Sequence, residues 1–310
     1  MVIQFVLLLA GLFLVVVGAD YLVEGSSSIA RRFGLSEFLI GLTIVGMGTS
    51  APEMVVSFIG AAQGNADISI GNVAGSNIFN TLLILGLTAI LLPMGITAEN
   101  KRKDVPTNIL ITVLLLVLGY FGGLSRWDGA ILLAAFVAYM WPQFRNKRAD
   151  EPAPEGEKPR KVWVATVMIL AGLGALVGGG NLFVNASVNI AHSLGVSDKF
   201  IAITLLAGGT SLPELATCVA AAVKKKGQLA LGNIIGSNIF NILLILGGSA
   251  LIHPLSFEAI TYVDMAALLV SALALLAACY VGRKDELDRT DGICFLLLFA
   301  GYMTYLILNL

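Results

Sequence analysis

Long apolar runs alternate with short polar segments along almost the whole chain. Ten of these runs approach or exceed the length that a helix needs to cross a bilayer, which is about 20 residues. They cover residues 3–23, 38–60, 68–92, 106–124, 128–144, 162–184, 200–223, 229–253, 262–282 and 290–308. The pattern predicts an all-α membrane protein with ten transmembrane helices. The first run has no basic segment before it and no clear cleavage site, so we expect it to remain as a span.

The longest polar segment divides the ten runs into two groups of five. This segment, Arg145 to Lys161, is rich in Pro, Glu, Lys and Arg, which predicts a solvated linker. The two groups repeat each other at an offset of 161 residues, and segments 71–86 and 232–247 share thirteen of their sixteen residues. The sequence therefore predicts a five-helix repeat at 1–144, a cytoplasmic linker at 145–161 and a second five-helix repeat at 162–310.

The basic residues indicate how the two repeats are oriented. Five spans are an odd number, so the second repeat must enter the membrane from the opposite side. If the N-terminus is outside, 17 of the 19 Lys and Arg residues lie on the inner side, and only Arg126 and Lys199 lie outside. Because basic loops remain in the cytoplasm, we expect inverted repeats, both termini outside, and a location in the plasma (cytoplasmic or inner) membrane.

Composition agrees with this picture and excludes other classes. The chain is 57% hydrophobic and 13% charged, with a mean hydropathy of +0.88, whereas a soluble domain has about 25% charged residues. A net charge of −1 indicates no nucleic-acid partner. The three cysteines form neither a zinc pattern nor a disulfide framework. We expect a monomer in the lipid bilayer with no cofactor.

A short motif with a carboxylate occurs in both halves within apolar sequence. Residues 48–53 read Gly-Thr-Ser-Ala-Pro-Glu, and residues 209–214 read Gly-Thr-Ser-Leu-Pro-Glu. A charge near the bilayer centre costs about 2.5–3.5 kcal/mol even on the lenient insertion scale, so two such acids indicate function. Pro52 and Pro213 have no N–H to donate, so nearby carbonyls can turn away from the helix. The motif predicts broken helices that carry an ion site.

Other oxygen-bearing side chains share a helix face with these acids. Thr49 and Ser50 precede Glu53 by four and three residues, and Ser76 precedes Asn80 by four. The second half repeats the same pairs with Thr210, Ser211, Glu214, Ser237 and Asn241. Oxygen ligands without sulfur or imidazole suit hard cations, and calcium takes six to eight oxygens in a flexible geometry. The two negative charges of two carboxylates equal in magnitude the charge of one Ca²⁺ or of two Na⁺.

In these segments the chain resembles the sodium/calcium exchangers of the calcium/cation antiporter superfamily, especially the prokaryotic members. The paired GTS-x-PE and GN-x-x-GSNIFN segments are similar to the two alpha-repeats of that family. The resemblance implies alternating access, export of Ca²⁺ against entry of Na⁺, and first and sixth helices that slide across the rest. It also implies a metal site. The central Ca²⁺ ligands would be Glu53, Glu214 and the carbonyls of Thr49 and Thr210. The flanking Na⁺ ligands would be Gly46, Ser50 and Ser76 in the first half, and Ala207, Ser211 and Ser237 in the second. The side chains of Asn80 and Asn241 would face the middle.

The chain departs from several relatives at one position of the implied site. Those relatives, including potassium-dependent exchangers, carry Asp at the position of Asn241, whereas this chain has Asn in both halves. A third carboxylate would help to hold K⁺ beside Ca²⁺, because neighbouring cations repel strongly where the dielectric constant is low. We therefore expect exchange that does not depend on K⁺.

Two other transport functions remain open. A Ca²⁺/H⁺ antiporter is the first, because a carboxyl group removed from water takes up a proton readily; the hydroxyls beside each acid favour Na⁺. A cation channel is the second, although inverted repeats with broken helices fit alternating access better. An enzyme is not expected, because there is no H-E-x-x-H motif and neither histidine lies near the two motif acids in the sequence.

Several polar residues outside the motif have simpler interpretations. Asp20 and Glu24 are expected at the membrane interface, because the matching residues of the second half, Asn181 and Asn185, are uncharged. The lysines at 224–226 are expected to anchor a helix and set the topology. The asparagines at 77 and 238 could be ion ligands or could form hydrogen bonds between helices.

Overall fold

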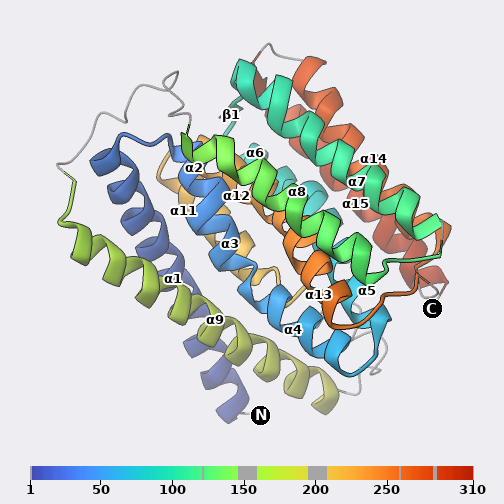
Figure 1. Ribbon diagram of the computed structural model, residues 1–310. Coiled ribbons are helices and arrows are strands. Elements are labelled where there is room, and N and C mark those ends of the chain that lie inside the picture. Colours follow the sequence, from blue (N-terminus) through green and yellow to red (C-terminus); the bar gives the residue numbers. More distant parts are fainter. Residues whose placement is uncertain are drawn as a thin grey trace.

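The computed structural model describes residues 2–120, 122–145, 159–194, 208–257, 260–281 and 285–309. These residues form a bundle of helices with one two-stranded ribbon (Figure 1). The elements are α1 Val2–Phe33, α2 Glu37–Ile40, η1 Gly41–Val45, α3 Gly46–Thr49, α4 Ala51–Ala62, α5 Ala66–Ile78, η2 Phe79–Ile84, α6 Leu85–Leu91, β1 Met94–Gly95, η3 Asn100–Asp104, α7 Val105–Tyr120, α8 Arg126–Arg145, α9 Val162–Ser193, α11 Leu212–Val223, α12 Gly227–Phe240, η5 Asn241–Leu246, α13 Gly247–Ile252, α14 Tyr262–Tyr280, β2 Glu286–Leu287 and α15 Arg289–Leu308.

The described helices confirm most of the predicted spans. Seven continuous helical segments are long and apolar enough to cross a membrane, and the bent segment from α2 to α4 adds an eighth. Helix α8 covers the fifth predicted span with 20 residues but is not among these eight. The seventh predicted span, 200–223, falls partly outside the described residues, which show α11 from Leu212. The linker also lies mostly outside them, because 146–158 are not described.

Helices α1 and α9 occupy equivalent places in the two halves and pack against each other on one side of the bundle (Figure 1). A Cβ atom on Gly18 would lie 2.8 Å from the carbonyl oxygen of Gly172, so the two backbones touch. Gly11 meets Gly179 and Gly25 meets Ala165, which shows that the helices are antiparallel. Small residues permit this close packing in membranes. The antiparallel arrangement agrees with the predicted inversion of the repeats.

Helix α12 and its continuation form the buried centre of the bundle. The segment Gly227–Ile252 is almost entirely covered by other elements, including α2, α3 and α11. Helices α7, α14 and α15 lie on the side away from α1 and α9 (Figure 1). The α5 and α12 helices both continue as π-helical segments, η2 and η5, whose residues include Asn80 and Asn241. Such irregular turns occur frequently at functional sites.

The two ends of the bundle differ in charge. We call the end where α1 finishes and α9 begins the basic end, and the opposite end the far end. The basic end carries the β1–β2 ribbon, in which Met94 pairs with Leu287, and an ion pair of 2.8 Å between Lys101 Nζ and Asp285 Oδ1. Helix α1 starts and helix α15 finishes at the far end (Figure 1).

Candidate functional site: an oxygen-lined cation site

The first motif breaks its helix as the sequence predicted. Helix α3 ends at Thr49 and α4 begins at Ala51, and the two segments meet at an angle of 47°. The connecting residue, Ser50, has φ −81° and ψ 8°. In the second half Ser211 has nearly the same backbone angles, φ −86° and ψ 6°, directly before α11. Pro52 thus stands at the start of α4, where a missing N–H does not break a hydrogen bond.

The two glutamates lie in the first turns of α4 and α11. Glu53 and Glu214 are both completely buried, at 0% exposure. The N-terminus of a helix favours negative charge, because its free N–H groups carry partial positive charge. Glu214 is also bound by Ser50, which precedes Glu53 by three residues, so the two acids lie near each other. The motif therefore concentrates two acids from different halves at one place.

Each glutamate is bound by the serine of the other half. The Ser50 hydroxyl donates to Oε1 of Glu214 at 3.0 Å, and the Ser211 hydroxyl donates to Oε1 of Glu53 at 3.3 Å. The second carboxylate oxygen of each acid is buried and has no hydrogen-bond partner among the described residues. A buried carboxylate without an opposite charge costs several kcal/mol. Two unpaired oxygens at one place are the arrangement that a cation would stabilise.

Hydroxyl and carbonyl groups surround the acids. The Ser237 hydroxyl donates to the Gly46 carbonyl at 3.3 Å, and the Thr49 hydroxyl donates to Oδ1 of Asn233 at 3.2 Å. Ser76 Oγ lies 3.5 Å from Ser211 Oγ, and the Thr210 hydroxyl is buried without a partner among the described residues. The predicted ligands thus come together, with one exception. Ala207 lies outside the described residues.

Four asparagines join the two halves by hydrogen bonds across the repeat. The side-chain nitrogen of Asn80 donates to Oδ1 of Asn238 at 3.3 Å, and that of Asn241 donates to Oδ1 of Asn77 at 2.9 Å. Asn77 and Asn238 therefore form hydrogen bonds between helices, which is one of the two roles that the sequence left open. The amide oxygens of Asn80 and Asn241 are buried and have no donor within the described ranges. Their nitrogens are occupied, so these oxygens are available to a cation.

Sequence reasoning missed two asparagines that support the site. The side-chain nitrogen of Asn72 donates to the backbone carbonyl of Glu53 at 3.1 Å and to the Ser57 hydroxyl at 3.0 Å. Asn233, the equivalent residue of the second half, donates to Cys218 Sγ at 3.3 Å while it accepts from Thr49. Their signal was present in the repeated Gly-Asn pair at 71–72 and 232–233. Cys218 thus has a polar role besides packing.

Comparison with known proteins decides the family. Residues 3–145 and 164–308 match the family described as sodium/calcium exchanger protein. The chain belongs to the sodium/calcium exchanger family. It is therefore an antiporter with transmembrane helices, from a family of transporters rather than of enzymes. The resemblance seen in the paired motifs is confirmed.

Individual relatives agree with this assignment over nearly the full length. The chain is 40% identical to a putative antiporter, CaxA, from Alkalimonas amylolytica, over 97% of this chain and 98% of the relative. It is 32% identical to the sodium/calcium exchanger MaX1 from Methanosarcina acetivorans, over 98% of both. A solved structure of the sodium–calcium exchanger NCX_Mj, soaked with Na⁺ and Ca²⁺, matches with a TM-score of 0.86 and 35% identity, over 98% of both chains.

Proposed function

We propose that this member of the family exchanges Ca²⁺ for Na⁺ across the plasma membrane by alternating access. One observation carries the proposal. The unpaired carboxylate oxygens of Glu53 and Glu214 and the unpaired amide oxygens of Asn80 and Asn241 are all buried in the part of the bundle where the two halves meet. Four unpaired oxygens with two negative charges suit a hard cation.

The charge of the site favours competition between one Ca²⁺ and Na⁺. The described residues hold no group of three or more acids, histidines or cysteines that could bind a metal ion, so the two glutamates supply the charge. One Ca²⁺ or two Na⁺ would neutralise them. An empty site leaves two buried charges unpaired. The protein should therefore change the side from which the site is accessible most easily when the site holds ions. Such a requirement couples the two ions.

The hydroxyl groups are the proposed additional ligands of Na⁺. In the first half they are Thr49, Ser50 and Ser76, together with the Gly46 carbonyl. In the second half they would be Thr210, Ser211 and Ser237, together with the Ala207 carbonyl. The Gly46 carbonyl accepts a hydrogen bond from Ser237 in the structure, and the Thr49 hydroxyl oxygen lies 3.4 Å from the same carbonyl oxygen. A bound Na⁺ would take the place of these hydroxyl groups at the carbonyl oxygen, while the hydroxyl oxygens turn towards the ion.

The proposed orientation places the basic end in the cytoplasm. The antiparallel packing of α1 and α9 supports inverted five-helix repeats at 1–144 and 162–310. An odd number of spans in each repeat and the 17-to-2 division of basic residues then support both termini outside and the 145–161 linker inside. Labelling of a cysteine placed at Pro154 by an impermeant reagent from outside intact cells would contradict this orientation.

Reconstitution in proteoliposomes tests the exchange directly. Uptake of radioactive Ca²⁺ is measured with an imposed gradient of Na⁺, K⁺ or H⁺ in turn, at a clamped membrane potential. We expect saturable uptake that requires Na⁺ on the opposite side and persists when K⁺ is replaced by an impermeant cation. Uptake driven by a proton gradient alone would indicate a Ca²⁺/H⁺ antiporter. Uptake without any counter-ion would indicate a channel.

A further inference from the structure

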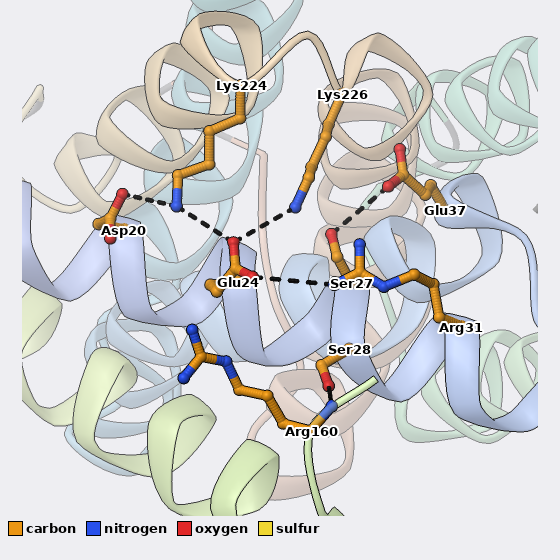
Figure 2. A network of polar contacts seen from close by, with 9 residues as sticks. All are labelled: Asp20, Glu24, Ser27, Ser28, Arg31, Glu37, Arg160, Lys224 and Lys226. Atoms are coloured by element: carbon orange, nitrogen blue, oxygen red, sulfur yellow. Dashed lines mark hydrogen bonds and ion pairs between the residues drawn. The ribbon is translucent and has the colours of Figure 1, made fainter. Parts of the chain in front are cut away.

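Four charged side chains outside the cation site connect two elements at the basic end. Lys224 Nζ lies 2.7 Å from Oδ1 of Asp20 and 3.4 Å from Oε2 of Glu24, and Lys226 Nζ lies 3.7 Å from the same Glu24 oxygen. The acids belong to α1, and the lysines belong to the turn between α11 and α12 (Figure 2). The sequence predicts an interfacial position for these acids and an anchoring role for the lysines, but it does not predict that they pair.

The two pairs of Glu24 are partly withdrawn from water, so they are stronger than ordinary surface pairs, whereas the Asp20 side chain that pairs with Lys224 is 52% exposed. The Glu24 side chain is 19% exposed and the Lys226 side chain is 13% exposed. Burial lowers the pKa of Lys226, and the charge of Glu24 opposes this effect. Partial burial strengthens the Coulomb attraction, and loss of one partner would leave the other charge incompletely hydrated.

A single helix, α11, joins the turn that carries the lysines to the cation site. Helix α11 starts with Glu214 in its first turn and finishes at Val223, next to Lys224. The pairs therefore connect α1 to the end of the helix that holds one of the two glutamates. They also line a polar cavity of about 500 Å³ together with Arg31 and Arg160. Separation of α1 from the α11–α12 turn would have to break these contacts.

The repeat provides an internal reference for this arrangement. At the offset of 161 residues, Asp20 and Glu24 correspond to Asn181 and Asn185 on α9, and Lys224 and Lys226 correspond to Gln63 and Asn65 in the α4–α5 turn. The two turns share their backbone shape, because the middle residue has φ 58° at Lys225 and φ 73° at Gly64. All four equivalent residues at the far end are uncharged.

The far end also differs in where its cavity leads, because only this cavity reaches residues of the two motifs. Asn181 and Asn185 line a cavity of about 470 Å³ that extends to Pro52, Thr210 and Pro213, beside the two glutamates. At the basic end the equivalent side chains are joined by ion pairs. The same repeated segments thus leave a cavity toward the site at one end and hold α1 against the α11–α12 turn at the other.

We propose that Asp20, Glu24, Lys224 and Lys226 form a latch that keeps the route from the cation site to the basic end closed and must break when that route opens. The inference rests on alternating access, because inverted repeats exchange their conformations when access changes sides. In the exchanged state α1 would leave the α11–α12 turn, and α9 would approach the α4–α5 turn, where the four equivalent residues are uncharged. The latch therefore favours the state that is open at the far end.

The repeat also supplies the variant that tests the latch. We would replace each latch residue by its counterpart from the far end: Asp20→Asn, Glu24→Asn, Lys224→Gln and Lys226→Asn together. These changes remove two charges of each sign and leave the net charge unchanged. The matched control is Glu99→Gln with Lys103→Gln, which removes a 2.8 Å pair at the same end that joins two residues of one helical segment.

The readout is cysteine accessibility from each side of oriented vesicles, without transported ions. Val177→Cys probes the far-end cavity, and Ser27→Cys probes the buried face of α1 beside the latch. Both are placed in a Cys294→Ser background, because Cys294 is exposed whereas Cys218 and Cys279 are buried. An impermeant maleimide is applied to right-side-out and to inverted vesicles.

In the latch variant we expect several-fold slower labelling at position 177 and several-fold faster labelling at position 27, with no change in the control. A partly unfolded protein would label faster at both positions, so the opposite changes identify a shift between two states. A second variant, Asn181→Asp with Gln63→Lys, installs a charged pair at the far end and should slow labelling at position 177 while the native latch is intact. Unchanged labelling in both variants would overturn the latch.

This test separates the latch from the proposed exchange. Labelling reports access alone and needs neither Ca²⁺ nor Na⁺. If the parent protein shows no Na⁺-driven Ca²⁺ uptake but labelling shifts as expected, the exchange proposal fails and the latch remains. If uptake is present and labelling does not shift, the exchange proposal remains and the latch fails.

Discussion

The two halves of the repeat have the same residues in the middle of the bundle but different residues at its two ends. In the middle, Glu53 and Glu214, the serines that bind them and the asparagines beside them are the same in both halves. At the ends, equivalent positions hold ion-paired charges on one side and amides on the other, although the turns share a backbone shape. In the proposed alternating access, ions reach the site from both sides, which favours the same residues in both halves. Each end faces only one side, so its residues can differ.

The largest expected effect concerns the symmetric middle. Glu53→Gln and Glu214→Gln should each reduce Na⁺-driven Ca²⁺ uptake by about 100-fold or more, because breaking a buried charge pairing costs about 3–5 kcal/mol. The two losses should be similar, since the acids have equivalent surroundings. The measurement is uptake in proteoliposomes, with the melting temperature in detergent as the folding control. Near-normal flux in both variants would place the site elsewhere.

A smaller effect is expected from the asparagines that orient the ligands. Asn77→Leu or Asn238→Leu would leave the amide nitrogen of Asn241 or Asn80 without its acceptor, a loss of about 1–3 kcal/mol. The freed amide could rotate and present its nitrogen to the ion. We expect the Ca²⁺ concentration at half-maximal uptake to rise about tenfold.

Asn108→Leu is the matched control for this prediction. Asn108 is also buried, at 2% exposure, but it lies in α7 outside the site. It should change stability without changing the apparent affinity for Ca²⁺. If Asn77→Leu and Asn108→Leu behave alike, the asparagines at 77 and 238 have a packing role only.

A change of charge in the middle should alter the response to protons. Asn241→Asp adds a third acid close to Glu53 and Glu214, and acids that crowd together take up protons more readily. We expect a several-fold stronger inhibition of Ca²⁺ uptake at mildly acidic pH than in the parent protein. The symmetric variant Asn80→Asp should behave similarly. Equal acid sensitivity of the parent and both variants would argue against a position close to the two glutamates.

The smallest effect concerns the turn that both ends share. Gly64→Ala places a side chain at φ 73°, which costs about 1–2 kcal/mol. Lys225→Gly in the equivalent turn should stabilise the protein slightly, because glycine accepts φ 58° without strain. Melting temperatures in detergent should therefore shift in opposite directions. A shift in the same direction would show that the side chains, rather than the backbone, decide the stability of these turns.

The sequence by itself determined the membrane class and the positions of most spans, and it predicted which residues form the proposed site. Membrane spans can be predicted without tertiary contacts, because the thickness and apolar nature of the bilayer set their length and composition. The break at Ser50 also followed from local chemistry, since Pro52 removes a hydrogen-bond donor at a known position. The span boundaries were less accurate at α1 and α9, which continue to Phe33 and Ser193 through polar residues that the hydropathy pattern excluded.

Only the tertiary structure decided which groups meet across the repeat. The serine of each motif binds the glutamate of the other half, and the orientation of the asparagine amides follows from partners about 160 residues away. No local pattern shows such pairings, because the residues around each partner in its own helix do not indicate which distant side chain it contacts. The ion pairs of Lys224 with Asp20 and Glu24 were hidden for the same reason. Charges read along a chain indicate topology, whereas their partners depend on how distant helices pack.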